Sequence, residues 1–496
     1  MISILNKLKN YNQTFSFKKN FFLYFSWTLI WLHLNSKINY SKLSFELSTE
    51  YFIDLINFTR YWIIFLIPFF FLVIFRLKSF KINTPIILLF AFSFLQIIAY
   101  GNFKYVNSDI YNELLLSNDL IKNGYNIRFS YSFFIFWIYI IINSFFSDNF
   151  LISFKSSITF IRIIIFSGLI YYLLEQDKIL KKYIFYFFIL IFFILIANSL
   201  KQFFFSIDFF GNVKPYMRLT DFSGGQKVGS FLLRFAPLVL LTFLYAFKKK
   251  NLFFYLLLIL PIPIILMAGE RVALLQYLLF VGGFVVFSKI QLKKKLIIFF
   301  IIFITLLTLL SLNKNLKTRL ITQSIAQFTG QNFHYSTGKI LPIDKDKKTR
   351  LKFFSEAHET HFLTAYKMYV DKKIIGHGIK SFRYKCSDKK YYINNNSCTT
   401  HPHNFLVLFL SELGLVGFTF FAIGLAYLYL NLFKIIFFRM SYVENLNYEQ
   451  ILLCSLSLSI IYFPLLPSGN FFNNWLLISI FYIFGFYIYE QKKIKK

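Results

Sequence analysis

Residues 296–312 read LIIFFIIFITLLTLLSL, a stretch that contains no charged side chain and follows three consecutive lysines. Its length approaches the roughly 20 mainly apolar residues that a helix needs to cross the hydrocarbon core of a bilayer. Lipid offers no water to main-chain polar groups, so such a stretch must fold as a helix. The pattern indicates a membrane-spanning helix, and similar stretches recur along the chain.

The composition of the whole chain points to the same class of protein. Of its 496 residues, 57% are hydrophobic, 22% are aromatic and 15% are charged, whereas a soluble domain has roughly 45–50% apolar and 25% charged residues. In a soluble protein the net charge of +32 would suggest a nucleic-acid partner, but here the basic residues lie mostly in short connections between apolar stretches. A soluble protein is excluded, and we expect no nucleic-acid partner.

About thirteen stretches approach the length of a membrane span. Their approximate cores are 20–34, 58–75, 84–100, 129–146, 158–174, 183–200, 230–247, 252–268, 272–288, 296–312, 414–433, 451–466 and 471–489. Positive charge marks the cytoplasmic side of a membrane protein. In the second half of the chain, the basic clusters alternate correctly with the stretches; they lie at 248–250, 293–295, 434–439 and 492–496. This alternation places residues 313–402 on the opposite side, which is the periplasm in a bacterium.

In the first half the alternation fails, because three apolar stretches lie between the basic clusters at 76–81 and 181–182. One segment within residues 60–180 is therefore miscounted or re-entrant. We predict an all-α polytopic integral membrane protein with about twelve transmembrane helices, or alternatively about fourteen. It would reside in the bacterial inner membrane.

The predicted domains are N-terminal transmembrane helices at 1–312, a large periplasmic catalytic loop at 313–403 and C-terminal transmembrane helices at 404–496. A loop of that length is usually functional or disordered. Apolar residues recur every three or four positions over 359–369, which predicts a short helix inside the loop.

The densest polar motif stands where this loop re-enters the membrane. It contains His401, His403 and Asn404, followed by Gly414 and Gly417. A neutral imidazole at a wet interface can act as a general base near neutral pH. The two glycines allow close helix packing or a re-entrant turn.

This motif resembles the signature of the O-antigen ligase and polymerase family, in which His is followed by Asn, Ser or Gln, nine residues, Gly, two residues and Gly. Here His403, Asn404, Gly414 and Gly417 fill those places. Phe418 departs from the ligase form, which often carries a small or hydroxylated residue there. The resemblance implies transfer of a glycan from a polyprenyl diphosphate, with His403 activating the acceptor hydroxyl.

Two further segments resemble the same family. Gly376 and Gly378, followed by Phe382, are similar to its Gly-x-Gly turn, where positive φ lets the main chain approach a ligand closely. Arg271 lies at a helix end that resembles the family's functional arginine. A guanidinium offers planar, permanently charged donors, so Arg271 is predicted to clamp the diphosphate.

The family's second arginine has no counterpart here, because His358 stands at its place ten residues before Met368. Arg350 and Arg383 are the nearest substitutes, so the second phosphate ligand stays open among the three. Arg218 and Arg234 are weaker candidates from an earlier loop and helix.

Cysteines and acids of the loop give the remaining predictions. An exported loop lies in an oxidising compartment, which favours a disulfide between Cys386 and Cys398, whereas Cys454 lies inside an apolar helix. Zinc bound by these thiols is the weaker alternative. Asp344 and Asp346 form an acidic pair that can hold a divalent ion in other membrane glycosyltransferases, but we predict no metal and no cofactor.

The predicted function is therefore a metal-independent, inverting glycosyltransferase of the O-antigen ligase type. Its donor would be a glycan linked to undecaprenyl diphosphate, and its acceptor the lipid A core. A polymerase that joins lipid-linked repeat units is the alternative. A flippase or other transporter is disfavoured because the spans are nearly free of acids.

Overall fold

The computed structural model describes residues 127–176, 180–215, 218–222, 224–247, 250–329, 331, 333–334, 339–340, 353–437 and 445–495. All of the described residues belong to one compact unit. The predicted spans at 20–34, 58–75 and 84–100 lie outside the described residues.

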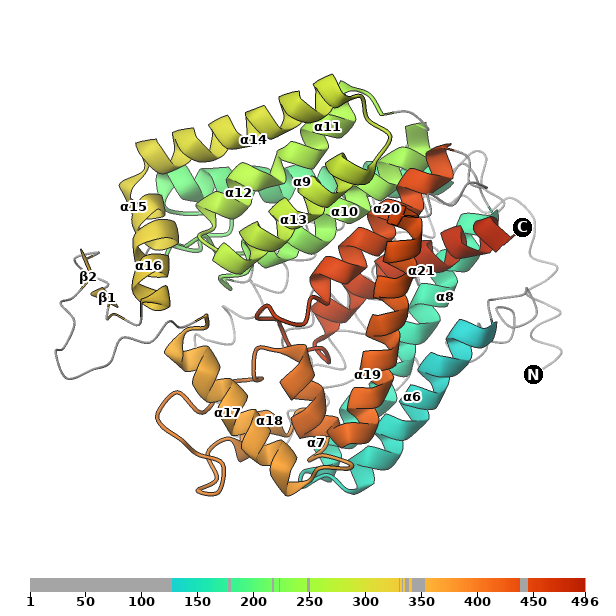
Figure 1. Cartoon of the computed structure of the whole chain (residues 1–496), viewed down its shortest axis with the longest axis vertical. Coiled ribbons are helices and arrows are strands. Elements are labelled where there is room, and N and C mark those ends of the chain that lie inside the picture. Colours follow the sequence, from blue (N-terminus) through green and yellow to red (C-terminus); the bar gives the residue numbers. More distant parts are fainter. Residues whose placement is uncertain are drawn as a thin grey trace, which may run out of the picture. The chain divides into compact units, whose positions relative to one another are not determined.

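Helices make up most of the described chain (Figure 1). In order they are α6 (Ile127–Phe145), α7 (Phe150–Thr159), α8 (Ile161–Gln176), α9 (Leu180–Phe205), α10 (Val228–Phe247), α11 (Leu252–Ile259), α12 (Pro261–Met267), α13 (Arg271–Phe287), α14 (Leu292–Leu312), α15 (Lys314–Lys317), the π-helical turn η1 (Thr318–Thr322), α16 (Gln323–Phe328), α17 (Glu356–Asp371), α18 (Phe382–Lys385), α19 (Phe405–Phe437), α20 (Asn445–Ile461) and α21 (Asn474–Lys495). Two strands of two residues, β1 (Phe333–His334) and β2 (Lys339–Ile340), pair antiparallel.

The predicted helical membrane class is confirmed for the described residues. Each of the ten predicted apolar stretches within them coincides with a helix or with two consecutive helices. Five of these helical segments are long and apolar enough to cross a membrane, and four shorter apolar helices accompany them. The total of twelve spans stays a prediction.

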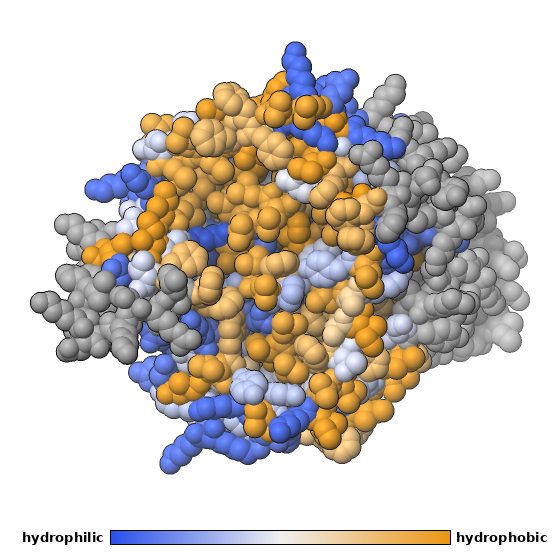
Figure 2. Space-filling model, viewed as in Figure 1, coloured by the Kyte–Doolittle hydropathy of each residue, from blue (hydrophilic) through white to orange (hydrophobic). Residues whose placement is uncertain are grey.

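The helices differ sharply in how much of their surface is covered. Helix α10 packs against α9 and α20, and 78% of its most apolar window is buried, whereas only 11% of the corresponding window of α14 is buried. The exposed side chains of α14 are large and apolar, including Phe300 and Phe303, and Figure 2 shows the apolar surface in that region. Helix α10 is therefore central, and α14 presents a surface suited to lipid.

Basic residues from separate parts of the chain meet at one end of the helices. Lys250 pairs with Glu449, Lys492 lies 2.8 Å from Glu175, and Lys181 Nζ donates to Tyr489 Oη over 2.8 Å. The lysines that the positive-inside rule assigns to the cytoplasmic side thus contact acidic and phenolic side chains.

Two local features differ from the predicted pattern. Helix α7 is a separate ten-residue helix, whereas the sequence predicted no helix between the stretches at 129–146 and 158–174. Asn149 caps α7, because its side chain accepts a hydrogen bond from the main chain of Ile152. The apolar helical segment that is long enough to cross a membrane here begins at Phe150, earlier than the predicted stretch at 158–174.

The second feature is a break inside α19 at Gly414, where φ is 63° and ψ is −166°. A side chain at this position would meet the main-chain oxygen of Ile374 at 2.3 Å, and one at Gly376, where φ is +69°, would meet the nitrogen of Gly414 at 2.5 Å. The main chains of the two glycines therefore touch. Hydrogen bonds from Gly378 N to Glu412 O (2.7 Å) and from Leu415 N to Lys373 O (2.8 Å) fix the crossing.

Candidate functional site

Four histidines from two segments of the chain lie together. His358 and His361 project from α17, and His401 and His403 precede α19, which packs against α17 (Figure 1). The ring of His403 lies 4.1 Å from that of His401, 5.2 Å from that of His358 and 5.3 Å from that of His361, measured between centroids. We call these four residues the histidine cluster.

Local hydrogen bonds set the position of each half of the cluster. Ser355 caps the first turn of α17, where its hydroxyl accepts from His358 N at 3.3 Å, and the same oxygen lies 2.9 Å from His358 Nδ1. His403 adopts a left-handed main-chain conformation with φ of 57°, and its carbonyl accepts from Ser468 N at 2.8 Å. The loop after α20 therefore anchors the motif.

Asn404 is buried, with 7% of its surface exposed, and its amide is engaged at both ends. Its oxygen accepts from Leu406 N at 2.8 Å, which caps α19, and its nitrogen donates to Pro464 O at 2.8 Å. These contacts hold the side chain of Asn404 within the protein, and its predicted place among the substrate-binding residues stays a prediction.

Burial and mutual repulsion keep the cluster uncharged. Burial lowers the pKa of His403 to about 2, with added contributions from His401, His358 and His361. Burial likewise lowers the pKa of His358 to about 4 and that of His401 to about 4. Within the described residues, the buried Nδ1 of His361 has no hydrogen-bond partner. At neutral pH the four imidazoles are therefore unprotonated and can accept protons or hydrogen bonds.

Arg271 lies beside this cluster, at the first residue of α13. Its guanidinium donates to Ser324 Oγ at 2.9 Å and to Gln327 Oε1 at 3.0 Å, both on α16. Its positive charge is close enough to His358 to contribute to the lowered pKa of that imidazole, after burial and His361. The structure thus brings together Arg271 and the histidine cluster, which are separated by more than 80 residues in the sequence.

Arg383 approaches the cluster from α18. Its charge and that of Lys227 add to the effect of burial on His401. The Nε atom of Arg383 is buried and has no hydrogen-bond partner among the residues that the structure describes. Arg383 is thus placed to meet an anion, while the competing candidate Arg350 and the acids Asp344 and Asp346 lie outside the described residues.

Glu270, which the sequence analysis gave no role, organises the start of α10. Its carboxylate accepts from Gly229 N (2.7 Å) and from Ser230 N (3.0 Å), so it caps that helix. Burial raises the pKa of Glu270 despite these bonds and the nearby charge of Arg218. Arg234, on the same helix, is 5% exposed. Because Glu270 directly precedes Arg271, this cap also fixes the end of α13 from which Arg271 projects.

Gly376 and Gly378 have positive φ, as the sequence analysis expected, but what approaches them is protein. Gly376 packs against Gly414, and a side chain at Gly378 would meet Ser147 Oγ at 2.2 Å. These contacts lock the loop against α19 and the turn between α6 and α7. The predicted approach of a ligand to the two glycines stays a prediction.

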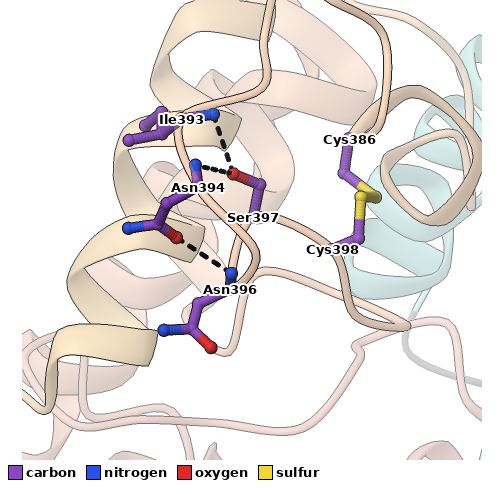
Figure 3. The surroundings of a disulfide bond; sticks show 6 residues. All are labelled: Cys386, Ile393, Asn394, Asn396, Ser397 and Cys398. Atoms are coloured by element: carbon purple, nitrogen blue, oxygen red, sulfur yellow. Dashed lines mark hydrogen bonds between the residues drawn. A yellow bond between two sulfur atoms is a disulfide. The ribbon is translucent and has the colours of Figure 1, made fainter.

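Cys386 and Cys398 form a disulfide (Figure 3). The turn between them is organised by Ser397, whose hydroxyl accepts from Ile393 N at 2.8 Å and from Asn394 N at 3.0 Å. The bridge ties α18, which carries Arg383, to the segment that leads into His401. Cys454 is a free, buried cysteine.

Within the described residues, no group of three His, Cys, Asp or Glu side chains has an arrangement that could hold a metal ion. The histidine cluster is therefore a set of aromatic contacts between imidazoles, and it lacks the convergent nitrogen atoms that a tetrahedral site requires.

A comparison with protein families finds a match over a segment that includes this site. Residues 256–422 match the family model described as O-antigen ligase, and the matched segment contains Arg271, all four members of the histidine cluster and Gly414. A comparison with curated proteins finds no match.

The match confirms the predicted relation to O-antigen ligases and polymerases. This family consists of glycosyltransferase-like enzymes that act on lipid-linked glycans, and the apolar helices fit a multi-pass membrane protein of lipopolysaccharide biosynthesis.

Proposed function

We propose that the protein is an O-antigen ligase, which transfers a glycan from undecaprenyl diphosphate to a sugar of the lipid A core. The observation that carries this proposal is that the imidazole of His403 packs against that of His358, whose pKa is lowered in part by the charge of Arg271. In this proposal the segment 313–403 faces the periplasm, and the remaining helices hold it in the inner membrane.

The proposed reaction is a direct displacement at the anomeric carbon of the donor. The acceptor hydroxyl oxygen attacks this carbon, the bond between the carbon and the phosphate oxygen breaks, and the electron pair leaves with the diphosphate. His403 accepts the proton of the attacking hydroxyl. Attack opposite the leaving group inverts the configuration, and no metal ion is needed when cationic side chains neutralise the diphosphate.

Arg271 supplies the first of these cations. A guanidinium donates two parallel hydrogen bonds to phosphate oxygens and keeps its charge at any physiological pH. Arg383 supplies the second in this proposal, because its buried Nε lacks a partner among the described residues and its charge reaches His401. Arg350 and His358 are the competing candidates for that place.

Binding of the donor would raise the pKa of His403. The pKa of His403 is about 2 because burial and the other imidazoles disfavour its cation. A bound diphosphate brings negative charge into the same space, and a nearby negative charge raises the pKa of an imidazole. His403 would therefore become an effective base only when the donor is bound. In the empty site its low pKa would keep it unprotonated.

Deletion of the gene tests this function, with lipopolysaccharide separated on a gel. A ligase predicts loss of all capped lipopolysaccharide and accumulation of carrier-linked polymer. Core bearing a single repeat unit would instead identify a polymerase, the alternative within the same family. An unchanged pattern of capped lipopolysaccharide would contradict both.

A further inference from the structure

Aromatic rings follow one side of α17, beginning at the histidine cluster. His358, Phe362 and Tyr366 are spaced four residues apart, so they lie on the same side of the helix. The rings of His358 and Phe362 are 6.3 Å apart between centroids, with 21° between their planes. Phe354 packs edge-on against Phe362 at 5.0 Å, and the ring of Tyr369 lies 6.1 Å from that of Tyr366. We call Phe354, Phe362, Tyr366 and Tyr369 the aromatic strip.

The aromatic strip is open to solvent. Tyr366 is 55% exposed, and the other three rings of the strip are partly buried. A different face of α17 packs into the protein, through side chains such as Ala365 and Met368, which are fully buried. Packing of the helix therefore does not account for the exposed ring of Tyr366. Exposed apolar surface that adjoins a reactive site is typical of a binding surface.

Hydrogen bonds connect the start of the aromatic strip to Arg271. The guanidinium of Arg271 donates to Gln327 Oε1 at 3.0 Å, and Gln327 Nε2 donates to the carbonyl oxygen of Phe353 at 3.5 Å. Phe353 directly precedes Phe354, the first ring of the strip. The strip therefore begins beside both the histidine cluster and the hydrogen-bond partner of Arg271.

The chemistry of the aromatic strip suits a chain of sugars. The face of an aromatic ring is electron-rich and attracts weakly positive C–H groups, which line the faces of a sugar ring. The hydroxyl groups of Tyr366 and Tyr369 can donate and accept hydrogen bonds, as sugar hydroxyls also do. From His358 to Tyr366 the helix rises by about 12 Å, which is longer than one sugar. The strip therefore fits several consecutive sugars.

We propose that the aromatic strip binds the glycan of the lipid-linked donor, at the sugars beyond the one that reacts. This inference rests on the proposed function, in which Arg271 holds the diphosphate to which that glycan is attached. The first sugar would lie at the histidine cluster, and the following sugars would stack along α17 toward Tyr366.

The test measures binding of carrier-free glycan to the purified full-length protein. Glycan is released by mild acid from the cell's own lipid carrier, separated by length and titrated against each variant, with saturation-transfer NMR as the readout. Tyr366→Ala removes the most exposed ring of the strip, and Tyr366→Phe keeps the ring but removes its hydroxyl. Tyr384→Ala is the matched control, because Tyr384 is a 46% exposed tyrosine on α18, outside the strip.

We expect Tyr366→Ala to weaken binding of chains of several repeat units by about three- to tenfold. Tyr366→Phe should bind nearly as the wild type does, because the face of the ring remains, and Tyr384→Ala should be unaffected. In a transfer assay, Tyr366→Ala should raise the KM for the lipid-linked donor by a similar factor. Its kcat should stay unchanged, because this ring lies away from the reacting atoms.

Three results would overturn the inference. The first is glycan binding that is equal, or equally absent, in the wild type and Tyr366→Ala. The second is the same loss of binding in Tyr384→Ala. The third is binding of released core oligosaccharide but not of donor glycan through Tyr366, because the strip would then serve the acceptor.

The outcome is separable from that of the ligase proposal, because glycan binding is measured without turnover. If gene deletion leaves lipopolysaccharide unaltered while Tyr366 still governs glycan binding, the ligase function fails and the glycan-binding strip stands. If deletion removes capped lipopolysaccharide while Tyr366→Ala binds glycan normally, the ligase function stands and the strip is rejected.

Discussion

Two histidines of the same loop, His377 and His403, differ in what surrounds them. His377 is 1% exposed; its Nδ1 lies 2.8 Å from Asp148 Oδ2 and its Nε2 lies 3.0 Å from Met368 O. A second carboxylate, Asp371, is 3.8 Å away. His403 has three other imidazoles as its neighbours.

In the proposed function, this difference separates a structural histidine, His377, from a catalytic one, His403. Burial alone would raise the pKa of Asp148, but hydrogen bonds from His377 and Lys372 outweigh it and lower that pKa. Both nitrogen atoms of His377 thus bind protein groups, beside the contact between Gly376 and Gly414. We call this contact the joint. The cluster around His403 is left uncharged beside arginines. Changes at the joint should remove folded protein, and changes at the cluster should remove activity.

The largest effect is expected at the joint. Gly376→Ala places a side chain against main-chain atoms at 2.5 Å to 2.6 Å, where nothing flexible can move aside, and positive φ costs about 1–2 kcal/mol more. We expect almost no folded protein in membranes, measured by fluorescence-detected size exclusion. Gly424→Ala is the control, because its new methyl group meets nothing within 4 Å. Similar folded amounts of the two variants would contradict the contact between Gly376 and Gly414.

At the cluster, Arg271→Ala should reduce transfer by about 100-fold or more at unchanged abundance, because a buried diphosphate loses charge-assisted hydrogen bonds. Arg271→Lys keeps the charge but loses the planar fork, so it should remain strongly impaired, with a higher KM for the donor. EDTA should not affect the wild type. Normal turnover by Arg271→Lys, or activity that EDTA abolishes and a divalent ion restores, would transfer the role to Asp344 and Asp346.

A smaller effect is expected for His377→Asn, which removes the imidazole between Asp148 and Met368. Loss of such buried hydrogen bonds costs about 1–3 kcal/mol. Thermal unfolding should begin at a lower temperature, while the transfer rate per folded molecule stays near that of the wild type. Lys389→Ala serves as the control for unfolding. A folded, thermally unaltered His377→Asn that has lost transfer would place His377 among the reactive residues.

The smallest effect concerns pH. His358 and His401 have pKa values of about 4 in the fold against 6.5 for free histidine, so between these values the unfolded chain binds more protons. Stability is therefore lost as the pH falls from about 6.5 toward 4. Melting curves of the wild type should shift down across this window, and those of His358→Gln should shift less. A wild type that is more stable at the acidic end would contradict the uncharged cluster.

Hydropathy and local periodicity predicted much of this fold. The ten apolar stretches within the described residues contain helices, and the periodicity of 359–369 predicted α17 within three residues at each end. The sequence analysis did not predict helix α7, because its ten residues include a lysine and three serines. These polar residues weaken the apolar signal of a short helix. The sequence allowed either close packing or a turn at Gly414, and the structure shows a helix break that packs on Gly376.

The site was less predictable, because its contacts connect distant parts of the chain. The motif predicted His403 and Arg271, yet nothing local shows that Asn404 binds Pro464, 60 residues away, or that His377 meets Asp148, 229 residues away. The substrate-binding roles assigned to Asn404, Gly376 and Gly378 stay predictions. The spacing of the histidines indicates His361 only weakly as a site residue. It lies three residues after His358, on one face of a predicted helix.

The central claim is that His403 accepts the proton of the attacking hydroxyl, and one reconstituted assay tests it directly. Purified wild type and His403→Asn receive carrier-linked glycan and lipid A core, and transferred glycan and released undecaprenyl diphosphate are both quantified. Asparagine tolerates the positive φ of this position. We predict equal amounts of both products from the wild type and a loss of about 100-fold to 10,000-fold in the variant, with donor binding retained. Turnover of His403→Asn at the wild-type rate would contradict the account.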